Sequence, residues 1–502
     1  MGEPLLVLRN ISKDYVGVRA LDRVDFSLEK SEIHGLVGEN GSGKSTLIKI
    51  ISGVETPELG AEIKINGNTF NHLSSKISTD MGIRVIYQDL SLFPTLTVAE
   101  NIAFNMHLEE GKKLVRWGRM RETANRVIRE IGISIDLDRI VGTLSIADQQ
   151  LVAICRALVG KIILLILDEP TSSLTKNEVD ALASVIRDLQ SKGISILFIS
   201  HKLNEIFAIA ENITVLRDGK KVGVFKMGEL DNDSLAFHMT GKKITYTKLS
   251  SDFVKRKNLP KHPLLEVKKL SKRGNFKDVS FSLHKGEILG ITGLLGSGRT
   301  ELALALFGMN PADNGIVFIE GEPASIRTNK DAINLRIGYV PENRLLQGLV
   351  MPQSIGNNIV ITILEKLLNR LKLNDRQKKA MSIRKWVEDL AIKVPSTDSA
   401  VMTLSGGNQQ RVVLAKWIAT DPRILILDEP TVGIDVAAKS SIHHLMKLLA
   451  MRGIGIIMIS DEVHEVLYNC HRILIMRRGR IAEELSPNDI SEEELAQKVD
   501  EG

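Results

Sequence analysis

Residues 38–46 read GENGSGKST, and they stand between an apolar run, EIHGLV, and a helical pattern that begins at Lys44. Glycine allows the backbone to curl so that successive N–H groups can surround the oxygens of a phosphate. The start of the following helix adds the positive end of its dipole. The order strand, glycine-rich loop, helix therefore predicts a phosphate-binding loop in a doubly wound α/β domain.

All residues of this loop are predicted to bind a nucleotide. They are Gly38, Glu39, Asn40, Gly41, Ser42, Gly43, Lys44, Ser45 and Thr46. Lys44 is long enough to reach the β- and γ-phosphates, and the Ser45 hydroxyl stands where it can ligate Mg²⁺. The pattern by itself also arises by chance, but the strand before it and the helix after it favour the functional interpretation.

The chain repeats itself. VDFSLEKSEIHGLVGENGSGKST at residues 24–46 recurs as VSFSLHKGEILGITGLLGSGRTE at residues 279–301, and LILDEPTSSLT at 165–175 recurs as LILDEPTVGID at 425–435. Order shared over so long a stretch indicates a duplicated domain. We therefore expect one domain at residues 1–244 and another at 263–502, joined by a polar, proline-bearing linker at 245–262.

The bulk composition narrows the function classes. A chain of 502 residues is too long for one ordinary core. No apolar run reaches the length of about 18 residues that a membrane-spanning helix needs, and the first residues lack the pattern of a signal peptide. The two cysteines, Cys155 and Cys470, suit a reducing cytosol. The net charge of +5 argues for neither nucleic acid nor lipid as a partner.

Two adjacent carboxylates, Asp168 and Glu169, end the apolar strand ILLILD of the first half. Asp168 fits a partner of Mg²⁺, and Glu169 fits the group that polarises the attacking water in phosphoryl transfer. A solvated strand end is the simpler interpretation, but a phosphate loop in the same domain favours the catalytic one. His201 closes another strand, SILFISH, where an imidazole could touch the γ-phosphate or the water. A lone histidine there is more often structural, and only the order of elements favours a role.

LSGGNQQRVVLAKWIA at residues 404–419 resembles the signature motif of the ATP-binding-cassette (ABC) family. With the repeat, the resemblance covers essentially the whole chain apart from the linker and tail. It implies an α/β fold of two tandem P-loop nucleotide-binding domains, each with a RecA-like, mostly parallel sheet and with antiparallel β and α-helical subdomains. It also implies ATP and Mg²⁺ as cofactors.

In that family the signature of one domain closes on the γ-phosphate held by the other domain. The matching residues here are Ser405, Gly406, Gly407 and Asn408. By the same resemblance, Tyr15 stands where an aromatic ring stacks on adenine. Gln88, in VIYQDLSLFP, matches a glutamine that contacts the metal and the water and faces the membrane subunit. Both could also be ordinary loop residues.

The two halves are unequal. The first signature-like segment reads LSIADQQ, with Ile146 and Ala147 where the second half has glycines. In the second half Arg299 replaces the loop lysine, Glu342 stands where Gln88 would fall, and Asp461 replaces His201. Arginine keeps the charge of lysine but not its compact shape. The second half also lacks an aromatic residue for adenine, because the stretch that holds Tyr15 is shorter there.

Head-to-tail pairing of the halves would sort these features into one matching and one degraded composite site. The matching site takes the loop and Glu169 from the first half and the signature from the second. The degraded site keeps Thr300, Asp428 and Glu429, so Arg299 and Thr300 are still predicted to bind nucleotide. We expect one hydrolysing site and one that is weak or silent.

GYVPENR and the degenerate loop GLLGSGRTE resemble the double-cassette ATPase of bacterial monosaccharide importers of the ribose, galactose and xylose kind. The resemblance implies two permease subunits and, through them, an external sugar-binding protein as partners, with no nucleic acid. The chain would lie at the cytoplasmic face of the cell membrane, held there by the permease. The sequence does not name the transported sugar.

Other function classes share some of these features. Similar importers carry autoinducer-2 or nucleosides. Soluble double cassettes act on the ribosome, but they usually have a long charged helical linker and two intact sites. A DNA-repair cassette would need coiled-coil or zinc insertions, whereas the sequence has no long heptad run and only two cysteines. A silent ATP-binding switch fits poorly with the intact first-half motifs.

Overall fold

The computed structural model describes residues 3–109, 115–171, 174, 176–200, 203–241, 248–249, 262–369, 371–394 and 396–501. The chain divides into two compact units, Met1–Ile244 and Thr245–Gly502, which are described separately below as the first and the second unit. None of the helices among the described residues is both long and apolar enough to cross a lipid bilayer.

The elements of the first unit follow in chain order. They are β1 (Leu6–Tyr15), β2 (Val18–Leu28), β3 (Ile33–Val37), α1 (Lys44–Ile51), β4 (Glu62–Ile65), β5 (Asn68–Phe70), α2 (Ser75–Asp80), β6 (Ile83–Ile86), α3 (Val98–Glu109), α4 (Trp117–Ile131), η1 (Val141–Thr143), α5 (Ile146–Ala157), β7 (Leu164–Asp168), α6 (Lys176–Ser191), β8 (Ser195–Ile199), α7 (Leu203–Ile209), β9 (Asn212–Arg217), β10 (Lys220–Lys226) and α8 (Asn232–Thr240).

The second unit repeats this order. Its elements are β11 (Leu265–Lys272), β12 (Phe276–Leu283), β13 (Ile288–Thr292), α9 (Arg299–Leu306), β14 (Asn314–Ile319), β15 (Glu322–Ala324), α10 (Asn329–Asn334), β16 (Ile337–Val340), η3 (Arg344–Gly348), α11 (Ile355–Val360), η4 (Ile361–Leu367), α12 (Arg376–Asp389), η5 (Val401–Thr403), α13 (Gly406–Ile418), β17 (Ile424–Asp428), α14 (Val436–Met451), β18 (Gly455–Ile459), α15 (Val463–Asn469), β19 (Arg472–Arg477), β20 (Arg480–Leu485), η6 (Pro487–Asp489) and α16 (Glu492–Asp500).

Each unit contains two sheets with the same strand order. In the first unit a six-stranded sheet runs β10-β9-β3-β8-β7-β6, and a four-stranded sheet runs β2-β1-β4-β5. The six-stranded sheet is parallel except for the β9–β10 pair, whereas the pairs of the four-stranded sheet are antiparallel. The second unit has the corresponding orders β20-β19-β13-β18-β17-β16 and β12-β11-β14-β15. The predicted α/β architecture is therefore confirmed in both halves.

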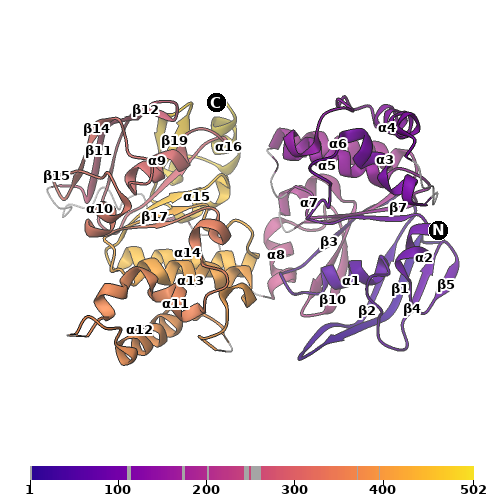
Figure 1. The fold of residues 1–502 in the computed structure, drawn as a ribbon, viewed down its shortest axis with the longest axis horizontal. Helices are drawn as coiled ribbons and strands as arrows, with labels where there is room; N and C mark the ends of the chain where they lie inside the picture. The colour runs from indigo at the N-terminus through magenta and orange to yellow at the C-terminus, as the bar shows by residue number, and fades with distance from the viewer. Residues whose placement is uncertain are drawn as a thin grey trace. The chain divides into compact units, whose positions relative to one another are not determined.

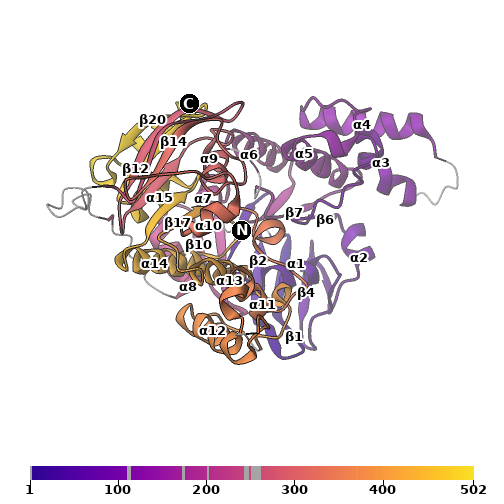
Figure 2. The ribbon, with the colours of Figure 1, turned by 60° about the vertical axis from the view of Figure 1, so that its left-hand side comes forward.

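The central strands form the core of each unit. Every residue of β3, β8, β13, β17 and β18 is buried, as expected for parallel strands covered on both faces. β3 and β8 lie on two of the apolar runs quoted from the sequence, and β7, which is buried up to its last residue, lies on the third. In Figure 1 the antiparallel strands of the second unit lie at one end of that unit and helices α11 and α12 at the other. Figure 2 shows α3 and α4 of the first unit extending away from β1 and β4.

A glycine in the left-handed region starts the helix after each loop. Gly43 precedes α1 with φ 103°, and Gly298 precedes α9 with φ 97°. A Cβ on Gly43 would lie 2.6 Å from the carbonyl oxygen of Ala20, and one on Gly298 would lie 2.9 Å from that of Asn275. Only glycine fits both the backbone conformation and the close approach of the neighbouring hairpin. This turn places each loop at the carboxyl end of the parallel strands.

Candidate active site

The first loop curls around its own lysine. Lys44, buried at the start of α1, donates hydrogen bonds to the carbonyl oxygens of Gly38 at 2.6 Å and Glu39 at 2.9 Å. The Ser42 hydroxyl is buried and has no hydrogen-bond partner among the described residues. Such an unsatisfied donor at a helix start suits a phosphate oxygen. Ser45 is exposed at the first turn of α1, and Thr46 is half-buried.

Asp168 and Glu169 lie where β7 ends, as the sequence predicted. Burial first, and then the charge of Glu169, raises the pKa of Asp168 to about 6, while Lys44 opposes the rise. A cation at this strand end would relieve the repulsion between the two carboxylates, so the donor set of Asp168 and Ser45 fits Mg²⁺. In the second unit the matching residues touch, because the Thr300 hydroxyl donates to Asp428 Oδ1 at 3.3 Å.

Both strand-end glutamates have a strained backbone. Glu169 has φ 49° and Glu429 has φ 47°. The N–H of Glu169 donates to the carbonyl of Ile199 at 2.9 Å, and that of Glu429 donates to the carbonyl of Ile459 at 3.0 Å. A residue with a side chain rarely adopts this conformation, and such strain concentrates at functional sites. The bond to the neighbouring strand fixes where each carboxylate begins.

Tyr15 and Gln88 lie in exposed positions. Tyr15 ends β1 beside the turn to β2, and its side chain is 40% exposed. Gln88 is exposed just after β6. Arg156 of α5 holds the segment behind it, since its guanidinium donates to the carbonyls of Leu90 at 2.7 Å and Ser91 at 2.8 Å. His201 lies outside the described residues.

The two signature segments start their helices differently. In the first unit the Ser145 hydroxyl caps α5 by accepting from the N–H of Asp148 at 3.1 Å. In the second unit Ser405 precedes α13 without a side-chain cap. Its hydroxyl instead accepts from Asn408 Nδ2 at 3.1 Å. Ser405 is exposed, so this hydroxyl is available to a ligand, as the sequence-based assignment requires.

The signature glycines also have a packing role that the sequence did not reveal. A Cβ on Gly407 would lie 2.7 Å from the Cβ of Ala438 in α14. A Cβ on Gly406 would lie 2.9 Å from Arg344 Nη2 and 3.1 Å from the carbonyl oxygen of Gly433. Glycine is therefore needed here by the second unit itself, whatever ligand it meets.

In the second loop the arginine that replaces lysine points to the strand-end carboxyl and not into its own loop. Arg299 Nη1 lies 3.8 Å from Glu429 Oε1, and both side chains are buried. The same carboxylate oxygen accepts from the N–H of Asp461 at 2.8 Å. Lys44 in the first unit turns into its own loop, whereas the longer Arg299 reaches the strand-end carboxyl.

Glu429 of the second unit is a strongly perturbed acid. Burial, and then the charge of Asp461, raises the pKa of Glu429 to about 9, and Arg299 offsets this rise only in part. Glu429 is therefore protonated at neutral pH and is a poor general base. Tyr339, which sequence reasoning missed, donates its hydroxyl to Asp428 Oδ2 at 3.1 Å. Its place in the segment GYVPENR, next to Glu342, was the signal that could have drawn attention to it.

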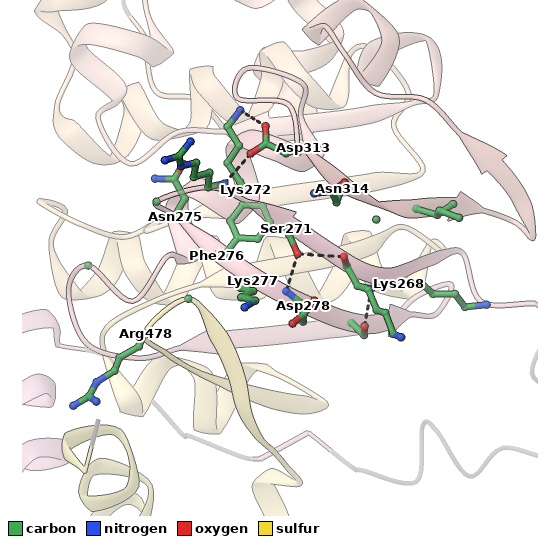
Figure 3. A pocket seen from close by; sticks show the side chains of 18 residues that line it. Lys268, Ser271, Lys272, Asn275, Phe276, Lys277, Asp278, Asp313, Asn314 and Arg478 are labelled. Atoms are coloured by element: carbon green, nitrogen blue, oxygen red, sulfur yellow. Dashed lines mark hydrogen bonds and ion pairs between the residues drawn. The ribbon is translucent and has the colours of Figure 1, made fainter.

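A basic hollow of about 1230 Å³ borders the second loop at Gly296 (Figure 3). Lysine and arginine side chains from the β11–β12 hairpin and from Arg478 line it, and Lys272 pairs with Asp313 at 3.1 Å. Phe276 also lines it but is 3% exposed, so it offers no free ring. The hairpin ends at Lys272 and Phe276, and it lacks the extension that carries Tyr15 in the first unit.

The state of Glu429 predicts how stability depends on pH. The folded carboxyl has a pKa near 9, against an ordinary value of 4.5, so between these values only the unfolded chain loses the proton. Stability should therefore fall as the pH rises, by at most about 1.4 kcal/mol per pH unit. Urea unfolding of the wild type and of Glu429→Gln between about pH 6.5 and about pH 8 should show a steeper loss for the wild type. Parallel slopes would contradict the assignment, since all other titrations are common to both proteins.

Comparison with known proteins agrees with these features. Residues 21–172 and 276–432 match the ABC transporter family. A ribose import ATP-binding protein of Rubrobacter xylanophilus is 42% identical over 98% of this chain and 97% of its own length. A xylose import ATP-binding protein of Moorella thermoacetica is 42% identical over 99% of this chain and 98% of its own. A structure titled as a model of ribosome-bound archaeal Pelota and ABCE1 shares the fold, with a TM-score of 0.62, 21% identity, and coverage of 97% of this chain and 80% of that chain.

The family match falls on both units and includes both glycine-rich loops and both strand-end carboxylate pairs. With relatives this similar over nearly the full length, it explains why each unit repeats the same two sheets. The chain belongs to the ABC transporter family, and it carries two ATP-binding cassettes in tandem.

Proposed function

We propose that this chain is the ATP-hydrolysing subunit of an ABC importer that drives the uptake of a monosaccharide. The observation that carries the proposal is the similarity, at 42% identity over nearly the full chain, to proteins named for ribose and for xylose import. The intact loop and carboxylates of the first unit supply the chemistry. We assign the two cassettes to residues 1–244 and 263–502, with 245–262 as the linker.

In the proposed mechanism the first unit binds and hydrolyses ATP. The loop N–H groups and Lys44 hold the phosphates, and Tyr15 packs against adenine. Glu169 accepts the proton of the attacking water, with His201 and Gln88 orienting that water. Ser45, Gln88 and Asp168 would hold Mg²⁺, which would supply positive charge to offset that of the phosphates. To exclude water and to position the γ-phosphate, the site then needs a second protein surface on the other side of the nucleotide.

We propose that the signature segment of the second unit supplies that surface. The Ser405 hydroxyl does not cap α13 and is exposed. Gly406, Gly407 and Asn408 begin that helix, whose positive end suits the γ-phosphate. Arg299 and Thr300 would hold a nucleotide that is not cut, because Glu429 is protonated at neutral pH. ATP would then close the two cassettes, and hydrolysis in one site would release them.

The proposed partners are two permease subunits and, through them, an external sugar-binding protein. Exposed apolar side chains follow the Gln88 position in the first unit and the Glu342 position in the second. They include Phe93 at 40% exposure, Leu345 at 46% and Leu346 at 82%. Contiguous exposed apolar residues suit a protein partner. We place the chain at the cytoplasmic face of the membrane, held there by the permease.

The assignment of the working site predicts unequal effects of two matched substitutions. Glu169→Gln should lower ATP turnover by about 10²–10⁴-fold, because it removes a general base, while ATP binding persists. Glu429→Gln should keep most of the turnover, because that carboxyl already carries a proton. Steady-state hydrolysis and nucleotide binding by the purified importer measure both. Normal turnover in Glu169→Gln would disprove the working site, and equal losses would disprove the asymmetry.

The transported class is tested by uptake. Cells that express this chain with its permease and binding protein should accumulate labelled ribose or xylose, and the Glu169→Gln variant should not. Accumulation of nucleosides or autoinducer-2 instead would replace the monosaccharide assignment while keeping the importer. ATP turnover stimulated by ribosomes, with no uptake of any solute, would replace the importer itself.

A further inference from the structure

Three segments of the second unit, far apart in sequence, meet at the guanidinium of Arg344. Its Nη1 donates to the carbonyl of Val432 at 2.6 Å and its Nη2 donates to that of Gly433 at 3.1 Å. Both carbonyls belong to the turn that leaves β17 after Glu429. The position of a Cβ on Gly406, at the start of α13, lies 2.9 Å from Nη2. Arg344 therefore joins the segment after β16 to the turn after β17 by hydrogen bonds, and its Nη2 lies close to the first residue of the signature helix.

The segment that carries Arg344 is itself firmly shaped. Arg344 opens the π-helical turn η3, and the Asn343 side chain caps it by accepting from the N–H of Leu346 at 3.0 Å. Short π-helical turns are rare and often mark functional sites. The cap fixes the backbone at the start of η3, and the backbone sets the direction in which the Arg344 side chain extends.

The other end of η3 is attached to the same signature helix. Lys416 of α13, a buried lysine, donates to the carbonyl of Gly348 at 2.5 Å. A Cβ on Gly348 would lie 3.1 Å from the Cγ2 of Val413, also in α13. One end of η3 thus carries Arg344, whose Nη2 lies close to the start of α13, and its other end meets Val413 and Lys416, which is in the last turn of α13. η3 therefore lies against the signature helix at both of its ends.

The opposite side of η3 is exposed and apolar. Leu345 is 46% exposed and Leu346 is 82% exposed, whereas Leu349 just beyond is buried. These leucines follow Glu342, the position that matches Gln88 in the repeat. A docking partner would contact the two exposed leucines, while Arg344 keeps its hydrogen bonds to Val432 and Gly433.

At the matching position the described part of the first unit offers no arginine. Leu90 stands where Arg344 stands in the repeat, and a leucine side chain forms no hydrogen bond. Arg156 of α5 holds the carbonyls of Leu90 and Ser91, much as Lys416 holds Gly348. The anchor in the last turn of the helix is therefore present in both units. Arg344, close to the start of α13, belongs to the unit with the glycine-bearing signature.

We propose that Arg344 is the positioning residue that makes signature placement at Ser405–Asn408 depend on docking at Leu345 and Leu346. Contact with the membrane partner sets η3, Arg344 carries its position to Gly406 and to the turn at Val432, and the signature then closes on ATP. The inference rests on the proposed function, in which that signature completes the site at Lys44. Arg344 touches no nucleotide in this scheme.

The test uses the complete importer, with this chain, its permease and its binding protein. The readout is the ratio of ATP turnover with ribose-loaded, or xylose-loaded, binding protein to turnover without it, because the fraction of folded enzyme cancels in a ratio. Arg344→Ala should lower this ratio by about tenfold, since two charge-assisted hydrogen bonds are lost. Arg344→Lys, whose single ammonium cannot reproduce the guanidinium fork, should fall between. The KM for ATP should not change, because Lys44 and its loop are untouched.

Arg336→Ala is the matched control. Arg336 lies just before β16, at the other end from the η3 segment, and its Nε donates to the carbonyl of Asp421 at 3.0 Å in a partly exposed contact. This variant should keep the wild-type ratio. An unchanged ratio in both Arg344 variants, beside a stimulated wild type, would overturn the inference alone. An equal loss in Arg336→Ala, or a raised KM that accounts for the Arg344 effect, would also overturn it. A wild type that neither sugar stimulates would overturn the proposed function together with the inference.

Discussion

The close approach of a hairpin to a glycine controls the architecture of both units. At Gly43 the backbone passes under the carbonyl of Ala20 in a conformation that other residues avoid, and a buried strand becomes a helix within a few residues. This turn puts the loop, the end of β7 and the end of β8 at one edge of the sheet. Ligand sites of open α/β sheets form at this edge. Loss of the turn would separate the phosphate loop from the carboxylates.

On this shared frame Arg299 and Asp461 act in opposite directions on the buried carboxyl of the second unit. Lys44 turns into the loop, where a phosphate would meet it, whereas Arg299 extends to Glu429. The buried carboxyl there, next to Asp461, keeps its proton at neutral pH. A carboxyl that keeps its proton is a poor general base, and this supports our proposal that the second unit does not hydrolyse ATP. In that proposal the second unit contributes its signature, where Ser405 precedes α13 without a side-chain cap.

Much of the fold was predictable, because buried parallel strands appear as continuous apolar runs and the glycine-rich loop has a strict spacing. The side-chain contacts were not. Arg299 was predicted to be a poor substitute for lysine, but its contact with Glu429 depends on burial that one sequence does not show. Gly407 was assigned to the γ-phosphate by resemblance, yet it also makes room for Ala438 in its own unit. The motif GYVPENR indicated no role for Arg344, because the partners of this side chain lie almost 90 residues away in the sequence. Contacts between segments that are distant in sequence leave no local pattern from which they could be predicted.

The central claim is that two similar cassettes provide a single hydrolysing site. The most direct test is a rapid acid quench of the assembled importer after one loading with labelled ATP, counting the ADP formed per chain in the first turnover. Our account predicts a burst of one ADP per chain, with any nucleotide bound by the second loop recovered as ATP. A burst of two ADP per chain would contradict it.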